Sequence, residues 1–311
     1  MEIIEWLLHD SDPSIIYQVK RDLLKQPCEE LEDIQHQIIQ NGWGKELLNK
    51  RRNDGHWGNG CYNPKWTCTH YVLYELLQLE IPRNQKECKE SAKVLLSNPY
   101  GKDGGINYAK IVEYSDVCIN GMILTIAAYF GIKSEQMDSI IEYLLKVQMN
   151  DGGWNCEYIH NAKHSSLHTT ISVLEGLETY LINHYTYRRN EIETVIEQSI
   201  DFILRHYLFR SETTGEIIKD EFLKYTFPIR WKYDILRCLD LFRKYDIQYD
   251  ERMEEAFEII ERTCNKNGRW KAYTQPGKTY FILEKPGSDS KWNTLRALRV
   301  LIHYNKRHAF V

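Results

Sequence analysis

Side chains of the types that bind zinc stand at the starts of two predicted helices, about one repeat apart in the chain. Asp116 and Cys118 open one apolar run, and His168 opens the next one. An aspartate, a cysteine and a histidine suit catalytic Zn²⁺, which takes three protein ligands and keeps one coordination position open. Cys156 is a candidate fourth ligand, and a closed four-ligand site would indicate a structural metal instead.

Each of these residues also has an ordinary structural explanation. A cysteine on an apolar helix is usually a small core residue, and Asp116 can cap the helix that Cys118 begins. His160, His164 and His168 recur at every fourth position, so one face of a short helix can carry them without a metal. The spacing is compatible with both interpretations, and zinc binding is a prediction to be tested.

Cations, aromatic rings and hydrogen-bonding groups also gather at the starts of other predicted helices. Segments 227–234 and 290–296 open the last two apolar runs, and segment 59–66 precedes the first. The candidate pocket residues there are Trp66, His70, Arg230, Trp231, Tyr233, Lys291 and Trp292. Aromatic rings of this kind can line a pocket for an apolar or cationic substrate. Trp231 and Trp292 are equally compatible with a packing role, with the cations as solvated groups at helix starts.

Asp234 is the candidate for acid catalysis without a metal. It stands at the start of an apolar run, where a carboxyl group can face a cavity. No second carboxylate stands beside it in the sequence to raise its pKa and keep it a strong proton donor. An ion pair with a neighbouring arginine, or an interaction with the helix N-terminus, is the favoured explanation.

An internal repeat positions these groups. Turn signals that combine glycine with aspartate or asparagine occur at 54–58, 103–106, 151–154 and 267–270, with a weaker one at 214–215. The first three lie about 50 residues apart, in the range of helical repeats. With the weaker signal at 214–215 included, the chain has five repeat units. Runs that precede the signals are 45–52, 91–96, 139–147, 198–208 and 253–263, and runs that follow are 69–81, 118–132, 168–182, 231–245 and 292–304. The preceding runs are amphipathic and the following runs are more apolar, and glycine ends the first helix of each pair.

This alternation predicts an all-α fold, an α/α toroid (barrel) of about five to six helix–turn–helix repeats. The apolar helices would form an inner ring and the amphipathic helices an outer ring. Residues 1–311 would form a single domain, with an N-terminal helix pair in 1–41 and the repeats in 42–311. An open solenoid of helix pairs is the alternative, although a Gly-Gly-Trp turn at each repeat is unusual in one.

The segment Gln148-Met149-Asn150-Asp151-Gly152-Gly153-Trp154 resembles two known repeats. They are the glutamine–tryptophan (QW) repeat of squalene–hopene cyclases and the Asp-Gly-Gly repeat of protein prenyltransferase β-subunits. The chain is thus similar to the terpenoid cyclase and protein prenyltransferase superfamily over about residues 42–304. A likeness of repeats is specific for a fold and much less specific for a reaction.

The resemblance implies particular site residues. Prenyltransferases bind catalytic zinc through an Asp-x-Cys and a His-Thr at helix starts, which match Asp116, Cys118 and His168. Lys110 would hold a diphosphate. Glu113 departs from the family's lysine, and a carboxylate there repels a diphosphate. The Asp-x-Asp-Asp signature of the cyclases is absent from the sequence.

Composition narrows the class of protein further. The net charge is −4, and acidic and basic residues are interspersed. The sequence therefore lacks the basic stripe that is typical of nucleic-acid-binding proteins. No apolar stretch approaches the roughly 20 residues that cross a bilayer. Two acids interrupt the first apolar run, which argues against a secretory signal. Eight cysteines are spread through the helical patterns, as expected of reduced thiols in a cytoplasm.

The sequence therefore predicts a cytoplasmic toroid enzyme of the prenyltransferase or squalene-cyclase type, a transferase, lyase or isomerase. It would use Zn²⁺ and act on an apolar, isoprenoid-like small molecule in a central cavity. One alternative is a metal-free, terpene cyclase-like enzyme with Asp234 as the acid. The other is a non-catalytic helical scaffold that binds a peptide or a lipid.

Overall fold

The computed structural model describes residues 3–109, 111–273 and 277–306. Thirteen α-helices are seen in these residues: α1 Ile3–Leu8, α2 Pro13–Gln18, α3 Glu32–Gln40, α4 Gly42–Asn49, α5 Thr69–Gln78, α6 Lys86–Leu96, α7 Val117–Tyr129, α8 Glu135–Lys146, α9 Leu167–Ile182, α10 Arg189–Arg205, α11 Ile235–Lys244, α12 Glu254–Arg262 and α13 Lys291–His303. Short helical turns are η1 Val19–Leu23, η2 Cys28–Leu31, η3 Cys156–His160, η4 Asp220–Leu223 and η5 Glu251–Met253. Strands β1 Trp270–Lys271 and β2 Asp289–Ser290 form one antiparallel pair.

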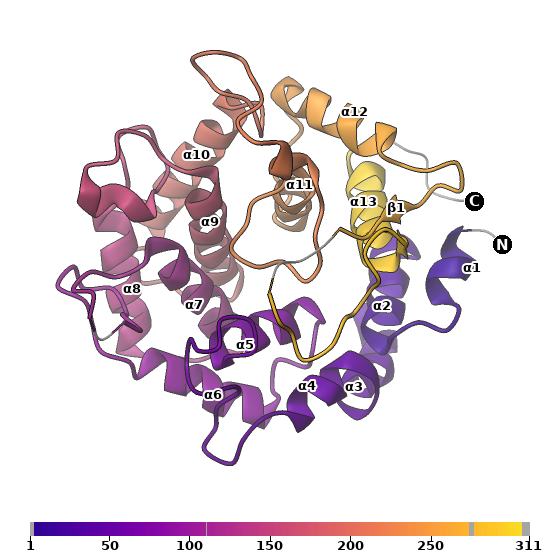
Figure 1. Ribbon diagram of the computed structural model, residues 1–311, viewed down its shortest axis with the longest axis horizontal. Coiled ribbons are helices and arrows are strands. Elements are labelled where there is room, and N and C mark those ends of the chain that lie inside the picture. The colour runs from indigo at the N-terminus through magenta and orange to yellow at the C-terminus, as the bar shows by residue number, and fades with distance from the viewer. Residues whose placement is uncertain (1–2, 110, 274–276, 307–311) are drawn as a thin grey trace.

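The helices form a closed double ring (Figure 1). Helices α5, α7, α9, α11 and α13 stand around the centre, and α6, α8, α10 and α12 lie outside them. The N-terminal segment closes the ring, because Gln18 accepts a hydrogen bond from Arg299 of α13 at 2.9 Å and donates to the Gln78 carbonyl of α5 at 3.0 Å. The predicted all-α toroid is therefore confirmed, and the alternative of an open solenoid is wrong.

The predicted helix starts agree with the structure to within a few residues at the inner ring. The run 231–245 differs most, since α11 begins only at Ile235. Asp234 is the reason: its carboxylate accepts a hydrogen bond from the backbone N–H of Arg237 at 2.7 Å and so caps the helix. In the same way Asp12 caps α2 through the N–H of Ser14, just before Pro13.

Three of the repeats are tied together by a turn tryptophan. Trp57, Trp154 and Trp270 are fully buried. Their indole N–H groups donate to carbonyls in the preceding outer helices, those of Leu47, Leu144 and Ile260, at 2.7–2.8 Å. Their backbone N–H groups donate to hydroxyls in the following inner helices, those of Thr69, Thr170 and Thr294, at 3.0–3.1 Å. The turn thus fixes the start of an inner helix to the end of the outer helix before it.

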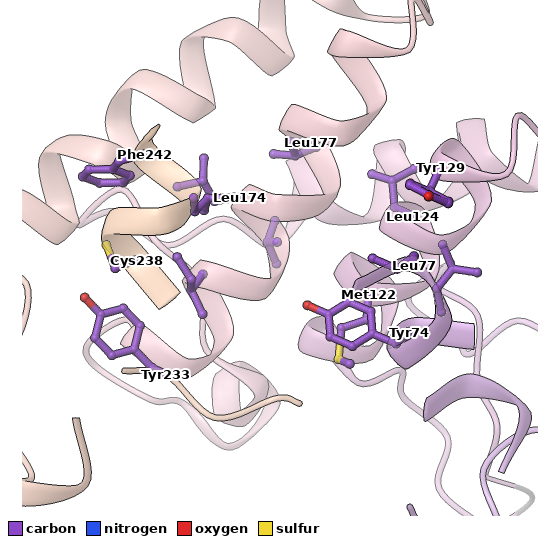
Figure 2. Close-up of a cluster of buried hydrophobic side chains, with 14 of the residues drawn as sticks. Tyr74, Leu77, Met122, Leu124, Tyr129, Leu174, Leu177, Tyr233, Cys238 and Phe242 are labelled. Carbon is purple, nitrogen blue, oxygen red and sulfur yellow. The ribbon is translucent and has the colours of Figure 1, made fainter. Parts of the chain in front are cut away.

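The inner helices build the core. All residues of α7 except Cys118 are buried, which explains why its sequence is apolar on every side. Figure 2 shows part of this core, to which four neighbouring inner helices contribute side chains such as Tyr74, Met122, Leu174 and Phe242.

Replacing Gly176 by alanine is expected to destabilise the fold by about 1–3 kcal/mol. Helices α7 and α9 touch backbone to backbone there, since a Cβ on Gly176 would lie 2.5 Å from the Gly121 carbonyl oxygen. Urea unfolding measures the change. Glu197→Ala, at an exposed position of α10, is the control and should shift stability by less than about 0.5 kcal/mol. Equal stability of Gly176→Ala and the wild type would contradict this close contact.

Candidate functional site

Three of the four predicted zinc ligands converge. The ligand atoms of Asp116, Cys118 and Cys156 all lie within 4.8 Å of one another. Asp116 directly precedes α7, Cys118 lies in its first turn, and Cys156 begins η3 after the tryptophan turn of the next repeat. Within the residues that the structure describes, no other histidine, cysteine and acidic side chains converge in groups of three or more.

The two thiols of this cluster share one hydrogen-bonding environment. The Cys156 Sγ accepts from the backbone N–H of Cys118 at 3.4 Å and from the Thr169 hydroxyl at 3.5 Å. A hydrogen bond with Cys156, together with burial, raises the pKa of the Cys118 thiol well above its usual value. Cys118 is therefore a neutral thiol at neutral pH when no cation neutralises it.

His168 lies outside this cluster. Its Nδ1 accepts a hydrogen bond from the backbone N–H of Tyr233 at 2.8 Å. The ring contacts those of Phe222 and Trp231, with centroids 5.1 Å away in each case. Burial, followed by the nearby charges of Lys219, Arg237 and Lys232, lowers the pKa of His168 to about 4, so the imidazole is neutral at neutral pH.

A cavity of about 870 Å³ adjoins the cluster. Asp116 and Cys156 line it directly. Its apolar and aromatic wall residues include Tyr62, Ile106, Tyr108, Val112, Tyr114, Ile119 and Ile159. Tyr108 and Tyr114 stand in the loop before α7 and were not singled out by the sequence, because no helical or turn pattern marks them. A tyrosine-rich segment just before Asp116 is the one signal that could have found them.

His70, a predicted pocket residue, is packed against this wall. Its side chain is fully buried, its Nδ1 lies 3.4 Å from the Tyr108 hydroxyl, and its ring contacts those of Tyr62 and Tyr71. Burial lowers the pKa of His70 to about 3, so the ring is neutral. The structure thus gives His70 a supporting place beside the cavity rather than a place on its surface.

A second cavity, of about 430 Å³, collects most of the other predicted pocket residues. Trp66, Arg230, Trp231, Tyr233 and Asp234 line it, together with Lys65, Glu221, Lys224, Thr226, Lys232 and Tyr273. The Arg230 guanidinium lies over the Trp66 ring at 4.1 Å, and the Lys65 ammonium lies 5.6 Å from the Trp231 ring. Segments about 165 residues apart in the chain thus form one wall, as the ring arrangement predicts.

Asp234 borders this second cavity and is almost completely buried, at 3% exposure. Burial raises its pKa, an effect that the charge of Arg296 opposes. Its carboxylate caps α11, so the predicted interaction with a helix N-terminus is present.

Lys291 and Trp292 do not reach these two cavities. The Lys291 ammonium donates to the His9 carbonyl and the Ser11 hydroxyl, each at 2.5 Å, and so holds the segment between α1 and α2. Trp292 stacks on Phe227 with ring centroids 3.9 Å apart and is 1% exposed. Lys291 thus has a structural role, whereas Trp292 packs on Phe227 and lines a different cavity. Lys110 lies outside the described residues.

All eight cysteines are free thiols. Among the described helices, none is both long and apolar enough to cross a membrane.

No family model and no curated protein matches the chain. Among solved structures, it is similar to a variant of the type II terpene cyclase MstE from Scytonema in complex with its product, merosterolic acid A. The two are 16% identical, the TM-score is 0.37, and the alignment covers 88% of this chain and 97% of the other. A complex of the same cyclase with geranylgeranyl dihydroxybenzoate is 14% identical, with a TM-score of 0.35 and coverage of 89% and 98%. The ligand-free cyclase is also 14% identical, with a TM-score of 0.35 and coverage of 90% and 98%. At these identities and TM-scores the similarity establishes neither the family nor the activity of this chain.

Proposed function

We propose that this chain is a zinc-dependent enzyme, with the metal held by Asp116, Cys118 and Cys156 and an apolar substrate in the adjoining cavity. The convergence of these three donors carries the proposal. One carboxylate and two thiolates form a set of ligands that suits zinc. Three protein ligands leave a coordination position for a water molecule or a substrate atom.

The surroundings of the donors support this fit. The Cys156 Sγ accepts two hydrogen bonds, from the Cys118 N–H and the Thr169 hydroxyl, and such bonds orient a sulfur that binds a metal. Zinc in such a place would polarise an oxygen atom or activate a thiolate or water. Free cysteines throughout the chain support a reducing, cytoplasmic setting for the site.

The wall of the 870 Å³ cavity supports an apolar substrate. Ile106, Ile119 and Ile159 bring aliphatic surface to it, and Tyr62 and Tyr108 bring rings stacked with their centroids 5.6 Å apart. A chain of isoprenoid units would bury its methyl groups against these side chains, and the tyrosine hydroxyls would orient a polar end. A non-catalytic scaffold would lack a convergent titratable cluster, so Asp116, Cys118 and Cys156 favour an enzyme.

The zinc content of the untagged protein tests the proposal. We expect one zinc per chain in the wild type and its loss in Cys118→Ala and in Cys156→Ala. Cys88→Ala, a buried cysteine of α6, is the matched control and should keep the metal. His168→Ala should also keep it, because His168 lies outside the group of converging ligand atoms. No zinc in the wild type after growth with added metal would overturn the proposal.

A metal-free, terpene cyclase-like activity with Asp234 as the acid is the second candidate. Its support is a nearly buried carboxyl group of raised pKa at a cavity that holds the aromatic rings of Trp66 and Trp231. An Asp234→Asn variant with the activity of the wild type on any accepted substrate would remove this candidate.

A further inference from the structure

A third cavity, of about 260 Å³, lies within the inner ring and is separate from the zinc cluster. Most of its lining residues come from the inner helices and the N-terminal segment, and they include Gln78, Tyr129, Thr179, Arg243 and Asp22. Neither Asp116, Cys118, Cys156 nor Asp234 lines it. A ligand here would therefore be separate from the proposed zinc site.

Cations outnumber acids in this wall. The cationic side chains are Arg21, Arg83, Arg237, Arg243, Lys244, Arg296 and Arg299, and the acidic ones are Asp22, Glu80, Glu175 and Asp240. The acids are already engaged: Asp22 and Glu80 pair with Arg21, Glu175 pairs with Arg237, and Asp240 pairs with Arg243 and Arg299. Arg83 and Lys244 are exposed, so the less accessible part of the wall carries one more cation than acids, and an unneutralised charge there is costly.

Among the cations of the wall that are not exposed, Arg296 is the one that these acids leave least satisfied. Its side chain is 1% exposed, and its Nε and Nη2 have no hydrogen-bond partner among the described residues. Its Nη1 makes long bonds to the Thr226 carbonyl at 3.3 Å and to Asn293 at 3.4 Å. The closest carboxylate oxygen, from Asp240, is 3.6 Å from Nε and is already bonded to Arg299.

Trp292 adds a further donor on the same face of α13. It lies one helical turn before Arg296, lines the same cavity and is 1% exposed. Its indole Nε1 has no hydrogen-bond partner in the described part of the chain. Leaving buried N–H groups unbonded costs free energy that a bound acceptor would restore. Water alone would satisfy the donors but would not neutralise the excess of positive charge.

We propose that the central cavity binds a compact oxyanion, a carboxylate or phosphate group, on Arg296 and Trp292. Two oxygens would accept from Nε–H and Nη2–H of Arg296, the paired geometry that guanidinium groups offer to either group. The Trp292 indole would donate to the same anion. At roughly 30 Å³ per water molecule, the cavity holds the volume of about eight waters, enough for a small anionic group.

Calorimetric titration with inorganic phosphate and with acetate, at constant ionic strength set with sodium chloride, tests the site. The wild type should bind at least one of the two saturably, and the tighter probe identifies the group as tetrahedral or planar. Arg296→Met should weaken this binding by about tenfold or more, because a charge-assisted bond pair is lost. Trp292→Phe keeps a ring against Phe227 but lacks the indole N–H, and should weaken binding roughly threefold to tenfold.

Two controls separate this site from others. Arg252→Met removes a surface arginine that pairs with Asp201 and Asp250, and should bind as the wild type does. Cys118→Ala should also keep the binding. Loss of binding in this variant would show that the anion binds to a zinc ion at the metal site instead. Absence of saturable binding of both probes to the wild type would overturn the proposal, as would unchanged binding in both Arg296→Met and Trp292→Phe.

Discussion

Replacing Arg237 by methionine is expected to lower the free energy of unfolding by about 3–5 kcal/mol. The guanidinium is fully buried and donates to Glu175 of α9 at 2.5 Å and to the Tyr74 hydroxyl of α5 at 3.1 Å. It also donates to the carbonyls of Arg230 and Lys232 at 2.8–2.9 Å. Removing the guanidinium takes this donor away from the Glu175 carboxylate and from the two backbone carbonyls inside the ring.

Denaturant unfolding at pH 7 measures this loss. A double variant, Glu175→Gln with Arg237→Met, should lose less than the single variant, because it no longer leaves a buried charge without its partner. Arg252→Met is the surface control and should change stability by less than about 1 kcal/mol. A loss for Arg237→Met no larger than for Arg252→Met would show that the network contributes nothing to the fold.

The Arg237 network also explains how the second cavity keeps its shape. Arg230 and Lys232 flank Trp231, and their carbonyls are held by one side chain from α11. The segment that they belong to has no regular secondary structure of its own. A rigid inner helix thus positions a loop that carries pocket residues, the usual way in which a scaffold orders a site.

Local patterns predicted the features that depend on neighbouring residues. Glycine turns, buried turn tryptophans and alternating helix types are short-range signals, and they led to the closed ring. Asp116, Cys118 and Cys156 converge because each follows a turn or starts a helix at a position fixed by its own repeat. Such residues can be placed once the register of the repeat is known.

Long-range contacts decided the rest. His168 also follows its repeat, but the backbone of Tyr233, 65 positions later, occupies its Nδ1. Lys291 was expected in the pocket, and the carbonyl of His9 from the other end of the chain binds it instead. Arg296 and Arg299 stand in a run that is apolar on the whole, and only closure of the ring brings Arg299 to Asp22 and Asp240. No pattern within one repeat encodes these pairings.

Replacing Glu178 by glutamine is expected to stabilise the protein at pH 8 by about 3 kcal/mol and to change little at pH 4. Burial raises the pKa of this carboxyl group of α9 from 4.5 to about 7, whereas Glu175, one turn earlier, is ion-paired with Arg237.

The sign of this effect follows from proton binding. Between pH 4.5 and 7 the folded state keeps the Glu178 proton that the unfolded state has released, so stability falls as pH rises through this range. Below pH 4.5 both states are protonated, and Glu178 does not destabilise the fold. Above pH 7 the buried carboxyl group is ionised, and the fold bears the full free-energy cost of burying its charge. Urea unfolding of both proteins at pH 4, 6 and 8 measures the difference. Glu197→Gln, at an exposed position of α10, is the matched control and should follow the wild type at every pH. A constant difference between Glu178→Gln and the wild type across this range would mean that the carboxyl group is solvated in the folded protein, and that α9 presents it to water rather than burying it.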